Sequence, residues 1–528
     1  MTVSKWMHAG VMLKMNARNY PDKLGCQDKA KQLTFREWNE RSCRLADALK
    51  NMGVGYGERV GVICYNRVEW MEIYAACGKG GQVVVPIMFR LSPGEYEYII
   101  NHAECKAFIV EETFVEGVNS VRHNLTTIPE ENYIYLGDGQ APEGYVHYED
   151  VMTRGNPAEP DIMVDAADPW VIMYTSGTTG KPKGVVRTHE SCVGMYMVNN
   201  ITTGVLPTDK PMLVMPMCHV NSIFYSFCYT LVTAPVMVYN MVSFDPEDLL
   251  KTIADYKITF TSLVPTHYIM ILSLPDEVKQ KYDTSSVRQL LISSAPARAD
   301  LKQAIMGYFK SAELWEGYGS TEASLVTCLR PEDQFRKLGS VGKEIFGTDQ
   351  IKLLDEDGNE VKDGEVGELY SRSPGMFTEY WKDPEKTKEV FRGEWCTAGD
   401  MARRDEEGYY YLVDRKANMI ISGGENIYPT EVENVLGAHQ AVKDVAVIGV
   451  PDQKWGELVM GIVILHEGYQ AGDELAQELI AFTKDKIAGY KRPKKISFIT
   501  DEEMPRTGTG KILHRVLRER YGKWSDSM

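Results

Sequence analysis

The stretch VGVICYNRVEWMEIYAACGKGGQVVVP, residues 60–86, decides the fold. Val60–Cys64 is a short apolar run that predicts a buried strand. Val68–Gly80 has apolar residues at helical spacing, and Val83–Pro86 is a second short apolar run. A strand, a helix and a strand in this order predict a mostly parallel sheet covered by helices, which is an α/β fold.

The same alternation extends in both directions from this unit. Apolar residues recur at helical spacing just before it, at Thr34–Met52. Further strands and helices are predicted at Val236–Tyr239, Asp248–Asp255, Thr259–Leu263 and Leu290–Ser293. The pattern therefore predicts a large N-terminal domain of helix-covered, mostly parallel sheets.

The chain changes character after Gly364, where glycine-punctuated segments predict a β-rich subdomain. A small α/β unit follows, with strands predicted at Val445–Val450, Leu458–Leu465 and Lys495–Ile499 and a helix at Glu474–Ile487. We place the boundary near Asp414–Asn418, so the predicted domains are residues 1–415 and 416–528.

The composition argues against a surface that coats nucleic acid. The 528 residues carry a net charge of −16, whereas affinity for nucleic acid comes from clustered lysine and arginine. The ten cysteines show no C-x-x-C pair and no zinc-ligand spacing, which predicts buried reduced thiols and a cytoplasmic location. The N-terminus lacks the continuous apolar segment of a signal peptide.

One uncharged segment, Val220–Phe244, is long enough to span a membrane. It contains Asn221, Asn240 and Pro235, so we expect no membrane span. The pattern instead predicts a buried helix from about Ser222, a turn near Pro235 and then a strand.

The stretch YTSGTTGKPKGVV, residues 174–186, follows Trp170–Thr175, an apolar run that predicts a strand. A strand followed by a glycine-rich loop is the layout of a phosphate site, because glycine lets backbone N–H groups approach oxyanions. The spacing does not fit G-x-x-x-x-G-K-[ST], which disfavours a P-loop kinase or ATPase. A flexible surface loop is the alternative that this composition usually indicates.

The loop resembles the signature of the adenylate-forming enzymes, which include acyl-CoA synthetases, stand-alone adenylation domains and luciferases. Further motifs of that superfamily follow in order: MPMCHVNS (215–222), SSAPAR (293–298), EGYGSTEAS (316–324), GEWCTAGD (393–400), DRKANMIISGGENIYPTEVE (414–433) and PRTGTGKILHR (505–515). Seven motifs in register over nearly the whole chain are far more specific than one. The chain resembles an AMP-forming acyl-CoA synthetase.

The resemblance implies that a carboxylate attacks the α-phosphate of ATP, giving an acyl-adenylate and pyrophosphate. The thiol of coenzyme A then displaces AMP. The implied ATP and AMP site comprises Thr175, Ser176, Gly177, Thr178, Thr179, Gly180, Lys183, Ala295, Glu316, Gly317, Tyr318, Gly319, Ser320, Thr321, Asp400 and Arg415.

Individual roles follow from the resemblance. Tyr318 stacks on adenine, Asp400 accepts the ribose hydroxyls, and Arg415 contacts ribose or phosphate. Glu322 meets Mg²⁺, a cation that prefers carboxylate and phosphate oxygens. Lys511 is the catalytic residue, because an ammonium between the carboxylate and the α-phosphate lowers the barrier. Structural roles, such as packing in a turn or solvated surface charge, are the alternatives for each.

The acyl site is implied at His219, Asn221 and Phe224. Amino-acid-activating relatives place an aspartate in this segment for the substrate ammonium, whereas this chain has Cys218 and His219. The surrounding residues are mostly apolar, so we expect an apolar, non-amino acid: small, branched, alicyclic or aromatic rather than long-chain. A core histidine is the alternative role for His219.

Coenzyme A is the expected thiol, because the chain ends fifteen residues after the 505–513 loop and leaves no room for a carrier domain. The implied CoA-binding residues are Gly423, Gly424, Trp455, Lys491 and Arg492. A solvated charge run is the alternative for the basic stretch KRPKK at 491–495. The resemblance places the hinge of a mobile C-terminal domain at Ala417, where relatives usually carry Asp or Lys; an ordinary linker residue is the alternative.

Other functions on the same scaffold stay open at this point. They are a luciferase-like oxygenase, a stand-alone adenylating enzyme and a binding protein without activity, although Lys511, Asp400 and Glu322 argue against the last. The reaction is close to reversible and could also run toward ATP. The expected partners are the carboxylate, ATP and CoA, and a homodimer is one alternative for the oligomeric state.

Overall fold

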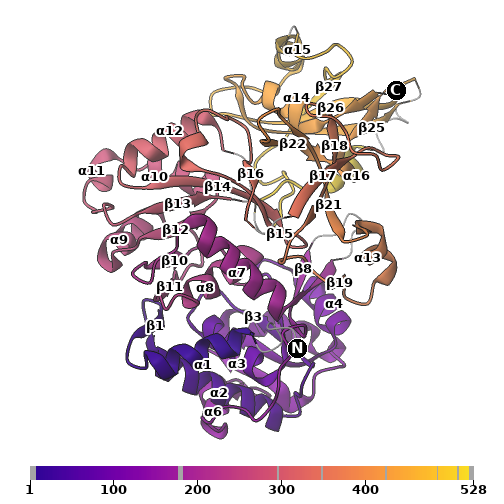
Figure 1. Ribbon diagram of the computed structural model, residues 1–528. Coiled ribbons are helices and arrows are strands. Elements are labelled where there is room, and N and C mark those ends of the chain that lie inside the picture. Colours follow the sequence, from indigo (N-terminus) through magenta and orange to yellow (C-terminus); the bar gives the residue numbers. More distant parts are fainter. Residues whose placement is uncertain are drawn as a thin grey trace. The chain divides into compact units, whose positions relative to one another are not determined.

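The computed structural model describes residues 7–175, 182–293, 297–346, 349–422, 425–452, 454–484, 486–507 and 510–522 (Figure 1). These residues form two compact units. The first unit lies within residues 1–177, 182–351 and 371–398, and the second within 352–370 and 399–528. The predicted domain boundary at 415/416 lies inside the second unit. That residues 416–528 move as one domain remains a prediction.

One sheet of the first unit has a parallel centre and antiparallel ends. Its strand order is β16 (Lys343–Glu344), β15 (Ser324–Leu329), β14 (Glu313–Ser320), β13 (Gln289–Ile292), β12 (Phe260–Leu263), β10 (Pro211–Leu213), β11 (Val236–Val238), β1 (Leu24–Gln27), β2 (Gln32–Thr34). Each pair of neighbouring strands between β14 and β1 is parallel.

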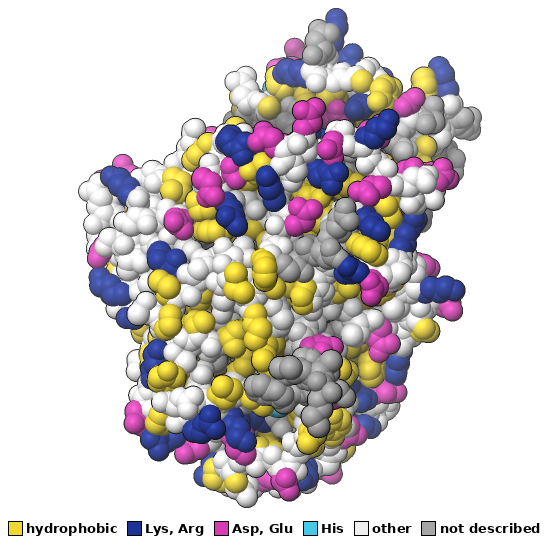
Figure 2. Space-filling view, viewed as in Figure 1, with side chains coloured by type: hydrophobic (Ala, Val, Ile, Leu, Met, Phe, Trp, Pro, Cys, Tyr) yellow, Lys and Arg dark blue, Asp and Glu magenta, His cyan; other side chains and the backbone are white. Residues whose placement is uncertain are grey.

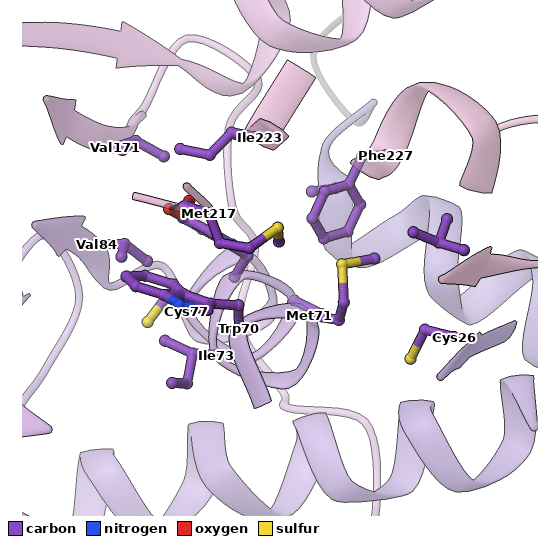
Figure 3. Packing of buried hydrophobic residues seen from close by; sticks show 14 of the residues in the cluster. Cys26, Trp70, Met71, Ile73, Cys77, Val84, Val171, Met217, Ile223 and Phe227 are labelled. Atoms are coloured by element: carbon purple, nitrogen blue, oxygen red, sulfur yellow. Dashed lines mark hydrogen bonds between the residues drawn. The ribbon is translucent and has the colours of Figure 1, made fainter. Parts of the chain in front are cut away.

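A second sheet contains the strands predicted from residues 60–86. Its order is β19 (Glu379–Tyr380), β9 (Lys183–Thr188), β8 (Pro169–Thr175), β4 (Val83–Pro86), β3 (Arg59–Ile63), β5 (Cys105–Glu111), β6 (Tyr133–Leu136), β7 (Val146–His147). β3 and β4 pair in parallel. Burial on both faces explains their continuous apolar sequences. Figure 3 shows Trp70 among this core, with Val84 and Val171 close by.

Helices cover these sheets in the first unit: α1 (Ala9–Asn19), α2 (Phe35–Asn51), α3 (Glu69–Gly80), α4 (Pro93–Ala103), α5 (Val115–Val121), α6 (Tyr148–Arg154), α7 (His189–Thr203), α8 (Val220–Thr230), α9 (Pro246–Tyr256), α10 (Pro265–Leu272), α11 (Asp276–Lys279), α12 (Ala299–Tyr308) and α13 (Pro384–Val390). Local sequence sets several starts. Thr34 and Glu37 form a capping box at α2, and Asp245 caps α9, whose first residue is Pro246.

The β-rich region after Gly364 and the small terminal α/β unit are both present. The former belongs to a sheet that also contains one strand before Gly364, with the order β17 (Asp349–Leu354), β18 (Val366–Arg372), β21 (Trp395–Arg404), β20 (Phe391–Arg392) and with β22 (Tyr410–Arg415) beside β21. The latter has the order β24 (Glu425–Ile427), β23 (Ile420–Ser422), β26 (Gly456–Leu465), β25 (Val442–Asp452), with β27 (Lys495–Phe498) beside β26. Its helices are α14 (Pro429–Leu436), α15 (Asp473–Phe482) and α16 (His514–Tyr521).

The predicted fold class is confirmed, and two element predictions need correction. The helix predicted over 474–487 ends at Phe482, because the side chains of Thr483 and Arg492 take the carbonyl of Ile480 as their acceptor. The strand predicted after Pro235 is short, because Asn240 beyond it turns its amide to Asp28 and Asn66.

The segment Val220–Phe244 forms α8 and β11. Within the described residues, every helix is too short or too polar to cross a membrane. On the face seen in Figure 2, lysine and arginine side chains are interspersed with aspartate and glutamate. That face therefore presents mixed charge rather than a basic stripe.

Candidate active site

The predicted phosphate loop joins the two strands of an antiparallel hairpin in the first unit. β8 ends at Thr175, which pairs with Lys183 at the start of β9. The strand predicted before the loop is therefore present. The intervening predicted residues lie outside the described part of the chain, and their contacts stay predictions: Ser176, Gly177, Thr178, Thr179 and Gly180.

Tyr380 links the predicted phosphate lysine to the predicted metal carboxylate. Its strand pairs with β9, opposite Val185. The ammonium of Lys183 lies 5.3 Å from the centre of the Tyr380 ring, and the Tyr380 hydroxyl donates to Glu322 Oε1 over 2.9 Å. Burial, then the neighbouring Lys386, lower the pKa of Lys183, while Glu322 raises it. One tyrosine thus contacts both groups.

The EGYGSTE motif lies along β14 and the turn that follows it. Residues Glu316, Gly317, Tyr318, Gly319 and Ser320 are on the strand, and Thr321 lies in the turn before β15. Tyr318 is half-buried and stands opposite Thr327. Ala295, the remaining predicted nucleotide residue of this unit, lies outside the described residues.

Glu316 is fixed by a buried ion pair that the sequence did not predict. Its carboxylate pairs with Lys302 of α12, and both side chains are almost completely buried. Burial raises the pKa of Glu316, although Lys302 opposes that shift. The pair anchors the start of the motif against α12. Because the Glu316 carboxylate is occupied by Lys302, the residue holds strand β14 in place.

The predicted acyl residues surround the start of α8. His219 is the residue before the helix and accepts, through Nδ1, a long hydrogen bond from the Asn221 backbone N–H. The Asn221 amide donates to Ser262 Oγ over 3.1 Å and to Ser293 Oγ over 2.9 Å. Phe224 is 8% exposed. The structure therefore brings an uncharged polar cluster next to an apolar wall.

In the second unit, Asp400 and Arg415 stand opposite each other on β21 and β22. Arg415 Nε lies 2.6 Å from Asp400 Oδ1. Asp414 instead accepts hydrogen bonds from the N–H and hydroxyl of Thr430 at the start of α14. The two predicted nucleotide residues are thus brought together, and the neighbouring Asp414 has a helix-capping contact.

Lys511 lies at an exposed turn. The Gly510 N–H donates to the Thr507 carbonyl, the Thr507 N–H donates to the Lys511 carbonyl, and the Lys511 N–H donates to the Thr507 hydroxyl. Gly510 has a φ of +85°, a left-handed conformation that glycine adopts without cost. The turn therefore presents the lysine side chain to solvent within its own unit.

Ala417, the predicted hinge, lies in a short 3₁₀ helix at Lys416–Asn418. It is exposed. The Lys416 ammonium pairs with Glu368 over 2.8 Å, and Arg518 donates to the carbonyls of Ala417 and Asn418. An ion pair of the preceding residue and two hydrogen bonds from Arg518 therefore hold the segment that contains the predicted pivot.

The predicted CoA residues differ in their availability. Trp455 is 43% exposed, with the Lys454 ammonium 4.9 Å from its ring centre. Lys491 pairs with Glu431 over 2.7 Å, and Arg492 donates to Thr483 and the Ile480 carbonyl. Gly423 and Gly424 lie outside the described residues. Lys491 and Arg492 thus make internal contacts, and their predicted role in binding CoA remains a prediction.

Sequence reasoning missed several residues that the structure brings to this region. They are Arg187, Ser262, Ser293, Lys302 and Tyr380. Arg187 had a usable signal, since a single charge within the apolar run GVVRT is unusual for a buried strand. The others had none, because their partners are distant in the sequence.

The chain combines two sheets of this order, Lys183 and Glu322 on either side of Tyr380, and a small unit that carries the Lys511 turn. The chain belongs to the family of AMP-binding enzymes, whose profile matches residues 13–381. The profile of the AMP-binding enzyme C-terminal domain matches residues 431–511. The resemblance stated from the motifs is confirmed.

Relatives along the full length narrow the class. The chain is 33% identical over 508 residues to a feruloyl-CoA synthase of Amycolatopsis, covering 96% of this chain and 97% of that one. It is 32% identical over 524 residues to an indoleacetate–CoA ligase of Aromatoleum aromaticum, covering 98% of both. A solved structure of the anthranilate CoA ligase AuaEII with anthranoyl-AMP superposes with a TM-score of 0.87 at 29% identity. The superposition covers 99% of this chain and 98% of that one. The protein is an AMP-forming acyl-CoA synthetase that uses ATP and CoA.

Proposed function

We propose that this synthetase activates a non-amino, largely apolar carboxylic acid, with small, branched, alicyclic or aromatic acids favoured over long chains. The observation that carries the proposal is the start of α8. Asn221, Ser262 and Ser293 supply uncharged polar groups there, and the buried Phe224 supplies an apolar wall. Among the described residues, the recorded partners of this cluster are an amide and hydroxyls, and none is a carboxylate that would pair with a substrate ammonium. The acids named for three relatives, feruloyl, indoleacetate and anthranilate, are aromatic and support that part of the proposal.

The proposed chemistry assigns one task to each group. Lys511 neutralises charge shared between the attacking carboxylate and the α-phosphate, which lowers the barrier to adenylate formation. Asp400 accepts the ribose hydroxyls, with Arg415 beside it. Lys183 contacts the departing pyrophosphate. Water exclusion around the acyl-adenylate then favours attack by the CoA thiol over hydrolysis.

A magnesium ion fits Glu322. Mg²⁺ in such sites takes one or two carboxylates plus phosphate oxygens. Among the residues that the structure describes, no cluster of three His, Cys, Asp or Glu side chains could hold a metal alone, so nucleotide phosphates would supply the remaining ligands. The bond from Tyr380 leaves the second oxygen of Glu322 for the ion. When bound, the ion would neutralise phosphate charge.

A carboxylate screen by pyrophosphate release tests the proposal. Benzoate, phenylacetate, cyclohexanecarboxylate and branched short acids should give kcat/KM values well above those of palmitate and of free amino acids. A best substrate with a long chain or an α-ammonium would contradict it.

Supplying acyl-CoA, AMP and pyrophosphate should form ATP if the reaction also runs in reverse. Ten buried, unpaired cysteines support the proposed cytoplasmic location.

A further inference from the structure

A small cavity lies in the first unit between α8, β9 and the start of β15. Its volume is about 10 Å³, and its walls include Met173, Arg187, Tyr196, Ile223, Phe224 and Ser324. A cavity of this size has room for about one water-sized group. Phe224 also belongs to the predicted acyl site, so the cavity lies at an edge of that site.

Arg187 contributes a buried charge to this cavity. The residue is 2% exposed, and a guanidinium does not lose its proton in a protein. Its hydrogen bonds go to neutral acceptors, from Nε to Ser191 Oγ over 3.3 Å and from a terminal nitrogen to the Thr321 carbonyl over 3.0 Å. Within the described residues we find no ion pair for it. A guanidinium has five N–H donors, so donors remain for a further acceptor.

Ser324 provides a second, independent sign of a ligand. It is 4% exposed, and its Oγ has no hydrogen-bond partner among the described residues. A buried hydroxyl without a partner costs free energy. Its φ of 63° is in the left-handed region, which is uncommon for a residue other than glycine and is retained mostly at functional sites.

We propose that this cavity receives one hydrogen-bonding oxygen of the acyl group, held by Arg187 and Ser324. The preferred substrates are then apolar acids that carry a hydroxyl, carbonyl or ether oxygen away from the reacting carboxylate. The inference rests on the proposed function, because it places the acyl group beside Phe224. A second carboxylate needs more room than about one water molecule occupies.

The energetic consequence is selectivity against hydrocarbon acids. An acid that fills the site without this oxygen leaves the buried Ser324 hydroxyl without a partner and adds no acceptor for the remaining Arg187 donors. Sites built around a hydrogen bond discriminate far more strongly than apolar pockets do, because the unpaired groups keep their desolvation cost. The rest of the acyl group is too large for a cavity of about 10 Å³ and lies outside it, on the side of the predicted acyl residue Phe224.

Matched acid pairs test the proposal through pyrophosphate release. The pairs are benzoate, phenylacetate and phenylpropanoate, each with its para-hydroxy form, and cyclohexanecarboxylate with its para-oxo form. For at least one pair, the wild-type protein should favour the oxygenated acid by about tenfold or more in kcat/KM. Ser324→Ala should reduce that ratio several-fold, and Arg187→Met should abolish it. Ser226→Ala removes a buried hydroxyl that already bonds Ile223 and should leave the ratio unchanged.

The outcomes separate this inference from the proposed function. Activity with these acids but ratios near one for every pair would overturn the inference and leave the proposed function intact. An unchanged ratio in Ser324→Ala would also overturn it, even if Arg187→Met failed to fold. If Arg187→Met raises the KM for ATP but keeps the kcat/KM ratio between the paired acids, then Arg187 only holds the Thr321 carbonyl and does not bind the acyl group. If no acid in the screen gives pyrophosphate release, both the proposed function and this inference are refuted.

Discussion

The two units hold their candidate site residues in different ways. In the first, Glu316 and Phe224 are buried and Asn221 is fixed by two hydroxyls. In the second, Lys511 and Ala417 are exposed on a turn and a short 3₁₀ helix. Buried, hydrogen-bonded groups favour one geometry, whereas exposed turns reorient at low cost. We infer that the first unit holds the acyl group, whereas the exposed Lys511 turn and Ala417 segment of the second unit serve one step at a time. The predicted ribose residue Asp400 is a buried exception in the second unit.

The largest effect is expected at Lys511, to which we assign adenylate formation and not the transfer to CoA. Lys511→Ala should lower adenylate formation by about two orders of magnitude or more, as for loss of one preorganised donor. Transfer to CoA from a supplied acyl-adenylate should remain nearly intact. Single-turnover assays of the two half-reactions measure this.

Arg515→Ala is the matched control for Lys511→Ala. It removes an exposed charge that pairs with Glu519 on α16, close in sequence to the lysine turn, and should leave both half-reactions near wild type. An equal loss in both half-reactions for Lys511→Ala, or no loss in either, would show that the assignment of this lysine is wrong.

The next effect tests whether the second unit must rotate. Proline fixes φ near −65°, which the 3₁₀ helix around Ala417 accepts. Ala417→Pro should therefore keep the present backbone conformation and prevent others. Adenylate should still form, while transfer to CoA should fall by more than about tenfold, because hinge residues must absorb a change in φ and ψ.

Ala417→Asp is the control for the proline variant, and its effect should be mild because the side chain is exposed. Arg518→Ala sharpens the test further. It removes the contacts to the carbonyls of Ala417 and Asn418, so it should loosen rather than lock the segment. Wild-type rates of both half-reactions in Ala417→Pro would place the pivot elsewhere.

A smaller effect is expected at Phe224 in the first unit. Phe224→Ala should change the kcat/KM ratio between bulky and small acids several-fold, since apolar pockets discriminate by about 1–3 kcal/mol per group. The KM for ATP should stay close to wild type. A uniform loss for all acids would mean that the ring serves packing alone, against Tyr225 and Tyr196.

The sequence predicted the elements of this fold well, because β3, α3 and β4 have short connections and clear apolar periods. It predicted the ends less well. The helix over 474–487 stops at Phe482 because Arg492, ten residues further on, bonds the Ile480 carbonyl. No local pattern contains that contact.

The candidate site divides in the same way. Motifs gave Lys183, Glu322, Asp400 and Lys511 as single positions. They could not give the pairing of Glu316 with Lys302, or the bond from Tyr380 to Glu322, because such contacts depend on packing between distant segments. Local sequence therefore marks the predicted site residues, and tertiary structure decides which side chains contact them.

Histidines extend the comparison to stability. In the first unit, burial, followed by Lys79 for His8 and Arg90 for His267, lowers the pKa of each of these two histidines to about 4. In the second unit, burial lowers the pKa of His514, but the contact with Glu433 outweighs it and the pKa is raised. Protonation therefore acts in opposite directions in the two units.

The smallest predicted effect follows from that difference. A lowered folded pKa gives stability that is present above the unfolded value of 6.5 and lost as pH falls toward 4. From pH 7 to 6, His8 and His267 should each remove about 0.7 kcal/mol, roughly threefold in the unfolding equilibrium. The His514 pair should gain stability over the same interval, since its contribution is full below 6.5 and lost as pH rises through its folded pKa. Hydrogen exchange resolved by unit, corrected for intrinsic rates, measures both. His514→Gln should remove the gain and leave the loss, and parallel responses in the two units would contradict the argument.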